Sequence, residues 1–171
     1  MTDRPIRLLQ QLPVFGGLPS RWLEFLLDRS STSEVSAGDY FFREADPGNA
    51  LFVLESGEVL VEKLWEGRPV FLGNLGEGEC FGEMSLVDLQ PRSASVRAVQ
   101  DSRAIKIDRE ALAELYQQDL EPYAIIMMNM GREISRRLRR ADERLFQLEQ
   151  SQTDRDDLDD FDDLDDRELF A

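Results

Sequence analysis

The chain contains no histidine, and Cys80 is its single cysteine. Histidine is the commonest general base and the commonest metal ligand, and it is the side chain that ordinarily titrates near neutral pH. Its absence excludes most hydrolase and metal-site designs, so we expect neither an enzyme nor a bound metal. A single cysteine allows no disulfide within the chain, and this fits a reducing compartment. The sequence therefore predicts a cytoplasmic protein.

Long apolar runs are also missing. The chain has no stretch of about 18 consecutive apolar residues, and no basic start followed by an apolar block. We therefore expect no membrane span, no secretory signal and no membrane partner. With 171 residues, of which 42% are hydrophobic and 32% charged, the chain can bury one ordinary core but hardly two. This predicts one domain with appendages.

Positive charge is scarce, and the negative charge is unevenly spread. Residues 154–171 hold ten acidic residues and two arginines, a net of −8, while residues 1–153 hold 25 acidic and 18 basic residues, a net of −7. Together these give the net charge of −15. We therefore predict a domain at residues 1–150 and an acidic, disordered tail at 151–171. Because most of this surface would repel a polyanion, we expect no DNA partner.

The acidic tail carries a repeated apolar pattern. Leu158, Phe161 and Leu164 recur every three residues among aspartates. Such alternation is typical of disordered segments that fold onto a basic, apolar groove of another protein. Dense like charge resists folding, so a merely solubilising tail is an equal alternative. A third possibility is that the tail docks on the chain's own arginine-rich RRLRR segment at residues 136–140.

The middle of the chain has the texture of short strands. Between Ser33 and Asp108, β-like runs alternate with turn signals such as the DPGN at residues 46–49. Several short strands at this spacing predict an antiparallel barrel or sandwich. The predicted strands are YFFRE, ALFVLES, EVLVEKLW, PVFLGN, ASVRAV and RAIKID.

Helical patterns lie on both sides of these strands. The segments PIRLLQQL and RWLEFLLDR predict two helices near the start, with Pro19 in the first turn of the second. Asp108 is an N-cap candidate for the helix REALAELYQQ. Glu121 and Pro122 open a last long helix that we expect to reach about Gln150.

One face of the last helix repeats like a coiled coil. Its apolar residues alternate spacings of four and three; they are Ile134, Leu138, Ala141, Leu145 and Leu148. Two interpretations stay open. This face joins two copies of the chain through the helix around residues 122–150, or it packs on the helix's own barrel. The arginines beside it are expected to form a solvated face rather than a nucleic-acid site.

The segment FGEMSLVDLQPRSASVRA, residues 81–98, holds the candidate binding residues. Gly82 allows the backbone to approach a ligand closely, and a helix that starts near Glu83, Met84 and Ser85 directs free N–H groups at an anion. Arg92 offers a planar pair of donors that suits a phosphate, whereas ionised Glu83 accepts from a hydroxyl. An anion site beside a hydroxyl-binding carboxylate describes a sugar phosphate. A triphosphate is not expected, because the chain lacks a Walker loop.

This segment resembles the phosphate-binding cassette of the cyclic nucleotide-binding domain family. The motif combines Gly82-Glu83, an arginine at fixed distance (Arg92) and a pair of small residues, Ser93 and Ala94, and the resemblance extends over about residues 5–150. It implies an α+β fold in which an antiparallel β-roll, an eight-stranded jelly-roll-like barrel, is flanked by N-terminal helices and a long C-terminal helix.

The resemblance also implies a role for each site residue. Glu83 would accept from the ribose 2′-hydroxyl, and Arg92 would bind the cyclic phosphate. The backbone N–H groups of Met84, Ser85 and Ser93, with the Ser93 hydroxyl, would complete the anion site. Val61 and Leu72 would lie against the base or the ribose. The alternative is that Glu83 and Arg92 form an ion pair that fixes a turn of an empty roll.

The identity of the nucleotide rests on one departure from the family. Some members contact adenine through a Thr-Ser pair on the last helix, where this chain has Ala141 and Asp142. Asp142 could accept from the adenine amino group or from two donors on guanine, or it could simply face solvent. Cyclic AMP is the expected ligand because of its frequency in the family, and cyclic GMP stays an alternative.

The resemblance further implies a regulatory function. Transcription factors of this family carry a helix-turn-helix domain after the long helix, whereas only an acidic segment of about 20 residues follows it here. We therefore expect a stand-alone sensor in which the ligand repositions the last helix and a protein partner, whose identity the sequence does not indicate, responds. The alternative is a scaffold that binds no ligand and acts through its acidic tail.

Overall fold

The computed structural model describes residues 3–165 of the chain, and the fold class is α+β. The chain divides into two compact units, Met1–Glu133 and Ile134–Ala171, and each is described by itself. The first unit holds every strand of the described chain. Its first helices are α1 (Asp3–Gln11), the short 3-10 helix η1 (Pro13–Phe15) and α2 (Ser20–Leu27).

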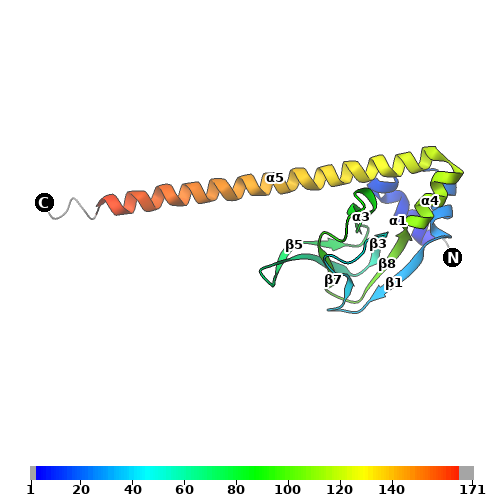
Figure 1. Ribbon diagram of the computed structural model, residues 1–171, viewed down its shortest axis with the longest axis horizontal. Helices are drawn as coiled ribbons and strands as arrows, with labels where there is room; N and C mark the ends of the chain where they lie inside the picture. Colours follow the sequence, from blue (N-terminus) through cyan, green and yellow to red (C-terminus); the bar gives the residue numbers. More distant parts are fainter. Residues whose placement is uncertain (1–2, 166–171) are drawn as a thin grey trace. The chain divides into compact units, whose positions relative to one another are not determined.

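The eight strands of the described residues form two antiparallel sheets that face each other in a roll (Figure 1). One sheet has the order β1-β8-β3-β6 and the other the order β2-β7-β4-β5. The bounds are β1 (Ser31–Val35), β2 (Tyr40–Phe42), β3 (Ala50–Ser56), β4 (Glu58–Trp65), β5 (Arg68–Gly76), β6 (Cys80–Phe81), β7 (Ser95–Ala98) and β8 (Ser102–Asp108). The structure thus confirms the predicted β-roll with helices on both sides of it in the sequence.

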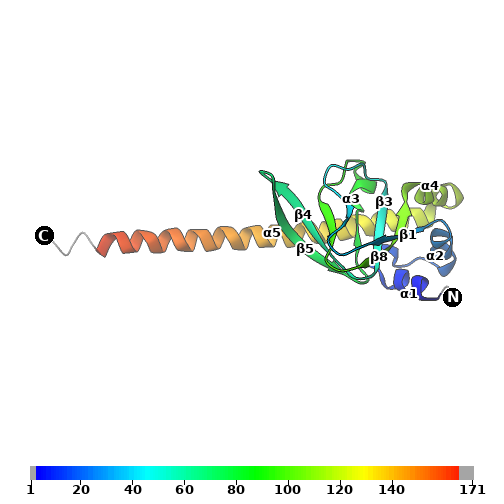
Figure 2. The same ribbon diagram turned by 90° about the horizontal axis from the view of Figure 1, so that it is seen from below.

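The remaining helices are α3 (Met84–Val87), α4 (Arg109–Gln118) and α5 (Leu120–Asp165). Figure 2 shows that α1, α2 and α4 gather at one end of the roll, while the β4–β5 hairpin extends at the other end. Two apolar clusters follow from this arrangement. One joins the helices to the outside of the first sheet, and the other, built around Phe52, Phe81 and Val96, fills the inside of the roll.

Most predicted elements occur where the sequence patterns place them, and the ends of two helices differ in detail. Pro19 is the N-cap of α2 rather than a residue of its first turn. Asp108 is the N-cap of α4, but its carboxylate makes no capping hydrogen bond. Instead, Asp108 Oδ1 lies 2.8 Å from Lys106 Nζ, two residues earlier in the chain. Lys106 on β8 is thus the partner of the Asp108 carboxylate, in place of the backbone N–H groups at the start of α4.

Two strands were not marked by the sequence patterns. β1 is a polar edge strand with the sequence STSEV, and β6 has only the two residues Cys80 and Phe81. Neither contains the alternating apolar run by which strands are identified in a sequence. β1 pairs with β8 along its whole length, from Ser31 opposite Lys106 to Val35 opposite Ser102. Pairing with a neighbouring strand therefore defines β1.

The last helix continues beyond the expected end at about Gln150. α5 extends to Asp165, so residues 151–165 are helical in the structure although the sequence predicts disorder there, and residues 166–171 lie outside the described residues. The division into a domain at residues 1–150 and an acidic tail at 151–171 stays a prediction. In the second unit, Leu138, Leu145 and Leu148 are exposed by 61, 60 and 62%.

In the part of the chain that the structure describes, no helix is long and apolar enough to cross a membrane.

Tyr40 provides a test of the sheet β2-β7-β4-β5. Its hydroxyl donates to Glu62 Oε1 at 2.6 Å, and Glu62 is only 9% exposed. This hydrogen bond, followed by burial, raises the pKa of Tyr40, so the folded state favours the neutral phenol. Because the folded pKa lies above the unfolded one, the contribution to stability is complete below pH of about 10 and is lost as the pH rises through the folded pKa.

We expect Tyr40→Phe to lower the free energy of unfolding by about 0.5–1.5 kcal/mol at pH 8. The difference from the original chain should shrink above pH of about 10, where the hydroxyl ionises. Urea denaturation at pH 8 and at several alkaline pH values measures both effects. Tyr116→Phe, at a tyrosine that is 55% exposed, is the matched control. A difference for Tyr40→Phe that stays constant to the highest pH would contradict the assigned hydrogen bond.

Candidate functional site

The segment at residues 81–98, here called the cassette, turns sharply after β6. Gly82 has φ +82°, a conformation that side chains rarely adopt, and a Cβ atom there would lie 2.6 Å from Arg92 Nη1 and 3.0 Å from the Ala50 carbonyl oxygen. Glu83 is the N-cap of α3, which then occupies one turn. The glycine therefore brings the backbone against the Arg92 guanidinium, and the short helix begins where the sequence indicates.

Arg92 is the central side chain of the cassette. It is only 5% exposed, and its Nη1 donates to the carbonyl oxygens of Ala50 at 2.9 Å and Gly82 at 2.8 Å. Its guanidinium carbon lies 4.1 Å from the ring centre of Phe42 and 5.7 Å from that of Phe52. Its buried Nε has no hydrogen-bond partner among the described residues. The Arg92 guanidinium thus lies against the aromatic interior of the roll with one N–H donor, Nε, still without an acceptor in the described part of the chain.

The electrostatics of Arg92 favour an anion. Burial lowers the pKa of the Arg92 guanidinium, and the charges of Glu83 and Asp46 offset part of this shift. The direction of the shift means that the surroundings compensate the buried cation incompletely. A phosphate beside it would supply both the missing charge and the missing acceptors. Glu83 is itself 2% exposed, so the acidic and the basic residue of the motif are buried together.

The loop between β2 and β3 holds the cassette in place, and the sequence patterns did not indicate this. The Arg92 N–H donates to the Asp46 carbonyl oxygen at 2.9 Å, and the Ala45 N–H donates to the Arg92 carbonyl oxygen at 2.9 Å. A Cβ atom at Gly48 would lie 2.3 Å from the Ser85 side chain. The DPGN pattern at residues 46–49 predicts only a turn. The contacts of the loop with the cassette join residues that are 37 to 47 positions apart in the chain, so no local sequence pattern indicates them.

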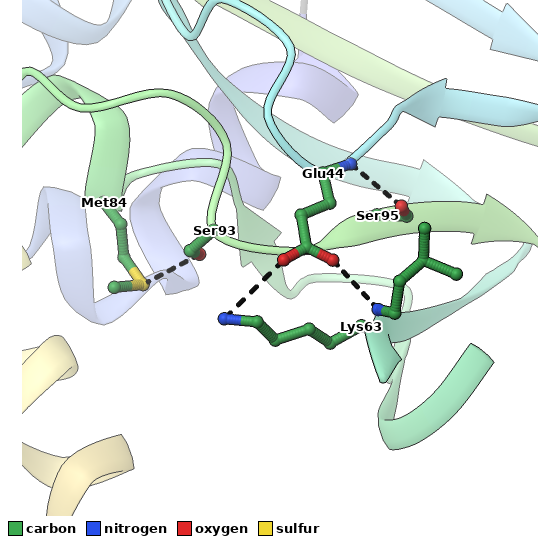
Figure 3. Close-up of polar contacts among 6 residues, drawn as sticks. Glu44, Lys63, Met84, Ser93 and Ser95 are labelled. Atoms are coloured by element: carbon green, nitrogen blue, oxygen red, sulfur yellow. Dashed lines mark hydrogen bonds and ion pairs between the residues drawn. The ribbon is translucent and has the colours of Figure 1, made fainter. Parts of the chain in front are cut away.

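The predicted cassette residues lie together in the structure. The Ser93 hydroxyl donates to Met84 Sδ at 3.5 Å (Figure 3). Ser85 and Ala94 are buried, with exposed fractions of 2 and 8%, whereas Met84 is 41% exposed. The cassette therefore combines buried small residues with a more open edge at Met84 and Ser93.

Two further predicted residues lie on the β4–β5 hairpin. Val61 pairs with Gly73 and packs against the aromatic cluster inside the roll. Leu72 occupies a break in the pairing register beside Val61 and is 46% exposed. Asp142 belongs to the second unit, and its side chain is exposed. The structure thus brings all the predicted residues except Asp142 into one unit.

A polar group that the sequence did not indicate lies beside the cassette. Glu44 Oε2 accepts from the Leu64 N–H at 2.9 Å, and Glu44 Oε1 lies 3.7 Å from Lys63 Nζ. The Glu44 N–H donates to the Ser95 hydroxyl at 2.9 Å, and Figure 3 shows Glu44, Lys63 and Ser95 beside Ser93. These contacts connect the loop after β2 to the β4–β5 hairpin.

Among the residues whose side chains the structure describes, 5–148 and 150, no three His, Cys, Asp or Glu side chains are grouped so that they could hold a metal ion. The arrangement instead places a buried arginine, a buried glutamate and backbone N–H groups around the open end of an antiparallel roll. Fold and site together fit a module for a small anionic ligand with a hydroxyl group.

The chain belongs to the cyclic nucleotide-binding domain family, whose sequence pattern matches residues 32–119. The cAMP-dependent protein kinase regulatory subunit of Emericella nidulans is 35% identical over 107 residues, which cover 63% of this chain and 26% of that protein. A CRP-like cAMP-activated global transcriptional regulator of Mycobacterium tuberculosis is 29% identical over 142 residues, or 82% of this chain and 62% of that protein.

Solved structures agree with this assignment. The crystal structure of the Thermus thermophilus catabolite activator protein superposes with a TM-score of 0.69 at 34% identity, covering 80% of this chain and 62% of that one. The chain thus spans at most 62% of the length of these three relatives. The first two relatives are named as the regulatory subunit of a cAMP-dependent protein kinase and as a cAMP-activated transcriptional regulator.

Proposed function

We propose that the chain is a cyclic nucleotide sensor and that cyclic AMP is its ligand. The observation that carries this proposal is Arg92, a buried cation whose Nε lacks a partner among the described residues and which faces the aromatic interior of the roll. A cyclic phosphate would accept from Arg92 and from the N–H groups at the start of α3, with Ser93 beside it. Glu83 would accept from the ribose 2′-hydroxyl, and Val61 and Leu72 would lie against the base or the ribose.

The bound nucleotide would act through the helices that follow the roll. Ligands change an arrangement only when they bind it better than the alternative. Arg109, at the start of α4, donates to the carbonyl oxygens of Gly48 and Ser85 at 3.0 and 3.1 Å. These contacts support a path from the cassette to α4 and α5. We expect the chain to act as a stand-alone sensor that regulates a protein partner rather than as an enzyme, in the cytoplasm.

The surface of the last helix supports an interaction with a second copy or with another protein. Leu138, Leu145 and Leu148 expose apolar surface on one helix face, as a homodimer through the helix around residues 122–150 requires. The net charge of −15 disfavours DNA as the partner. The second candidate function is a scaffold that binds no ligand. It is favoured by the same exposed face and by the acidic segment that continues α5.

The test of the proposal is a calorimetric titration of the purified chain with cyclic AMP and, separately, with cyclic GMP. We expect saturable one-to-one binding, tighter for cyclic AMP. If Asp142 contacts guanine, Asp142→Ala should weaken cyclic GMP binding about ten-fold or more, because hydrogen bonds to a charged acceptor are lost. Glu143→Ala removes a neighbouring charge and is the matched control. No binding of either nucleotide, on protein free of carried-over ligand, would favour the scaffold.

A further inference from the structure

A cavity outside the cassette lies where α3 meets α4 and the start of α5. Its volume is about 210 Å³. Its walls belong to the first unit alone, and they include Leu86 of α3, Leu112 and Tyr116 of α4, Tyr123 and Met127 of α5, and Arg109. None of these residues has been assigned to the nucleotide. The cavity is therefore a second candidate binding site.

Arg109 is the one charged side chain among the residues that line this cavity. Its Nη2 donates to the carbonyl oxygens of Gly48 and Ser85. Its Nε is buried without a hydrogen-bond partner among the described residues. Its Nη1 also donates no hydrogen bond to these residues. A partly buried cation with unused donors favours an anionic partner, because unmade hydrogen bonds to a charged group cost free energy. The Nη1 donors are the ones available to a ligand.

The other walls are apolar and include two aromatic rings. The Tyr116 and Tyr123 rings meet edge to face with their centres 5.2 Å apart. Leu86 and Leu112 are only 7 and 4% exposed, so they form the floor, whereas Tyr116 is 55% exposed and lies at the opening. An apolar cavity of about 150 Å³ accepts a benzene ring in other proteins. A cavity of about 210 Å³ therefore accepts one ring with a small substituent.

We propose that this cavity binds a small aromatic carboxylate. The carboxylate accepts from Arg109 Nη1, and the ring packs against Tyr116, Tyr123 and Leu86. Both halves of this ligand are required. Without the carboxylate the guanidinium donors stay unmatched, and without the ring the apolar walls stay exposed to water.

The position of the cavity couples it to the cassette, and this part of the inference rests on the proposed function. Arg109 contacts the carbonyl oxygen of Ser85, and a Cβ atom at Gly48 would meet both Ser85 and the Arg92 side chain. A carboxylate that accepts a hydrogen bond from the Arg109 guanidinium therefore alters the surroundings of Arg92. Linkage requires that the carboxylate and the nucleotide change each other's affinity by the same factor.

The experiment measures binding of benzoate and of its neutral analogue benzamide to the full chain by ligand-observed NMR. We expect benzoate to bind about ten- to a hundred-fold more tightly than benzamide, because only benzoate carries a negative charge that pairs with the Arg109 guanidinium. Ala113→Phe places a ring at an exposed lining position and should abolish benzoate binding. Gln117→Phe adds the same ring at an exposed position of α4 that does not line the cavity, and should leave benzoate binding unchanged.

Two further variants separate this site from the cassette. Benzoate binding should persist in Arg92→Gln and weaken at least ten-fold in Arg109→Gln. Loss of benzoate binding in Arg92→Gln would place the carboxylate in the cassette and overturn the inference, as would unchanged binding in Ala113→Phe or equal affinities of benzoate and benzamide. Titrating cyclic AMP with and without benzoate then measures the coupling. If cyclic AMP does not bind, the proposed function fails while the benzoate arms still decide the existence of this site.

Discussion

Replacing Arg92 with glutamine is expected to weaken cyclic AMP binding by about ten- to a hundred-fold. Glutamine keeps two hydrogen-bonding groups but loses the charge and the planar set of donors that suits a phosphate. A charge-assisted hydrogen bond contributes about 1.5–3 kcal/mol, and each 1.4 kcal/mol corresponds to a factor of ten. Isothermal titration calorimetry with the purified variant measures the loss directly.

The matched control for this prediction is Arg103→Gln. Arg103 lies on β8, in the sheet β1-β8-β3-β6, and pairs with Glu55 at 3.0 Å and with Glu34 at 3.7 Å on the surface. Its replacement removes the same charge from the chain but should leave the affinity for cyclic AMP within about two-fold, because exposed ion pairs contribute little. Arg92→Lys should rescue only part of the affinity, since lysine restores the charge without the planar fork. Unchanged affinity in Arg92→Gln would contradict the assignment of the cassette.

A methyl group at Gly82 is expected to weaken nucleotide binding by ten-fold or more. In Gly82→Ala the new Cβ atom would lie 2.6 Å from Arg92 Nη1, so the guanidinium has to leave its hydrogen bonds to Ala50 and Gly82. The positive φ of +82° adds about 1–2 kcal/mol of backbone strain. Calorimetric titration and urea denaturation of the same variant measure the two effects separately.

The control variant Gly78→Ala separates the effect of backbone strain from the effect of displacing the Arg92 guanidinium. Gly78 has the same φ of +82°, but its nearest neighbour would be Leu8 Cδ1 at 3.9 Å, an ordinary contact distance. We expect both variants to lose about 1–2 kcal/mol of folding free energy. Only Gly82→Ala should lose affinity. Equal affinities of the two variants would mean that the position of Arg92 does not control binding.

Local patterns predicted the elements of the fold well. The apolar runs of β3 and β4 and the turn signals between them are contained in contiguous segments, so the sequence alone indicates them. The cassette is also contiguous, since Gly82, Glu83 and Arg92 lie within eleven residues, counted inclusively. Their residue types therefore predicted the kind of ligand. β1 and β6 were missed because a polar edge strand and a two-residue strand carry no periodic signal.

The sequence by itself determined the family, the roll and the residues of the cassette, because each depends on the order of neighbouring residues. Only the tertiary structure decided what surrounds those residues. Arg92 donates to Ala50, 42 positions earlier, and lies over Phe42, which the sequence marked only as part of a strand. Likewise, Arg109 meets Gly48, 61 positions earlier, and lines a cavity with residues of α3 and α5. Such contacts form only when packing brings distant segments together, so no local periodicity encodes them.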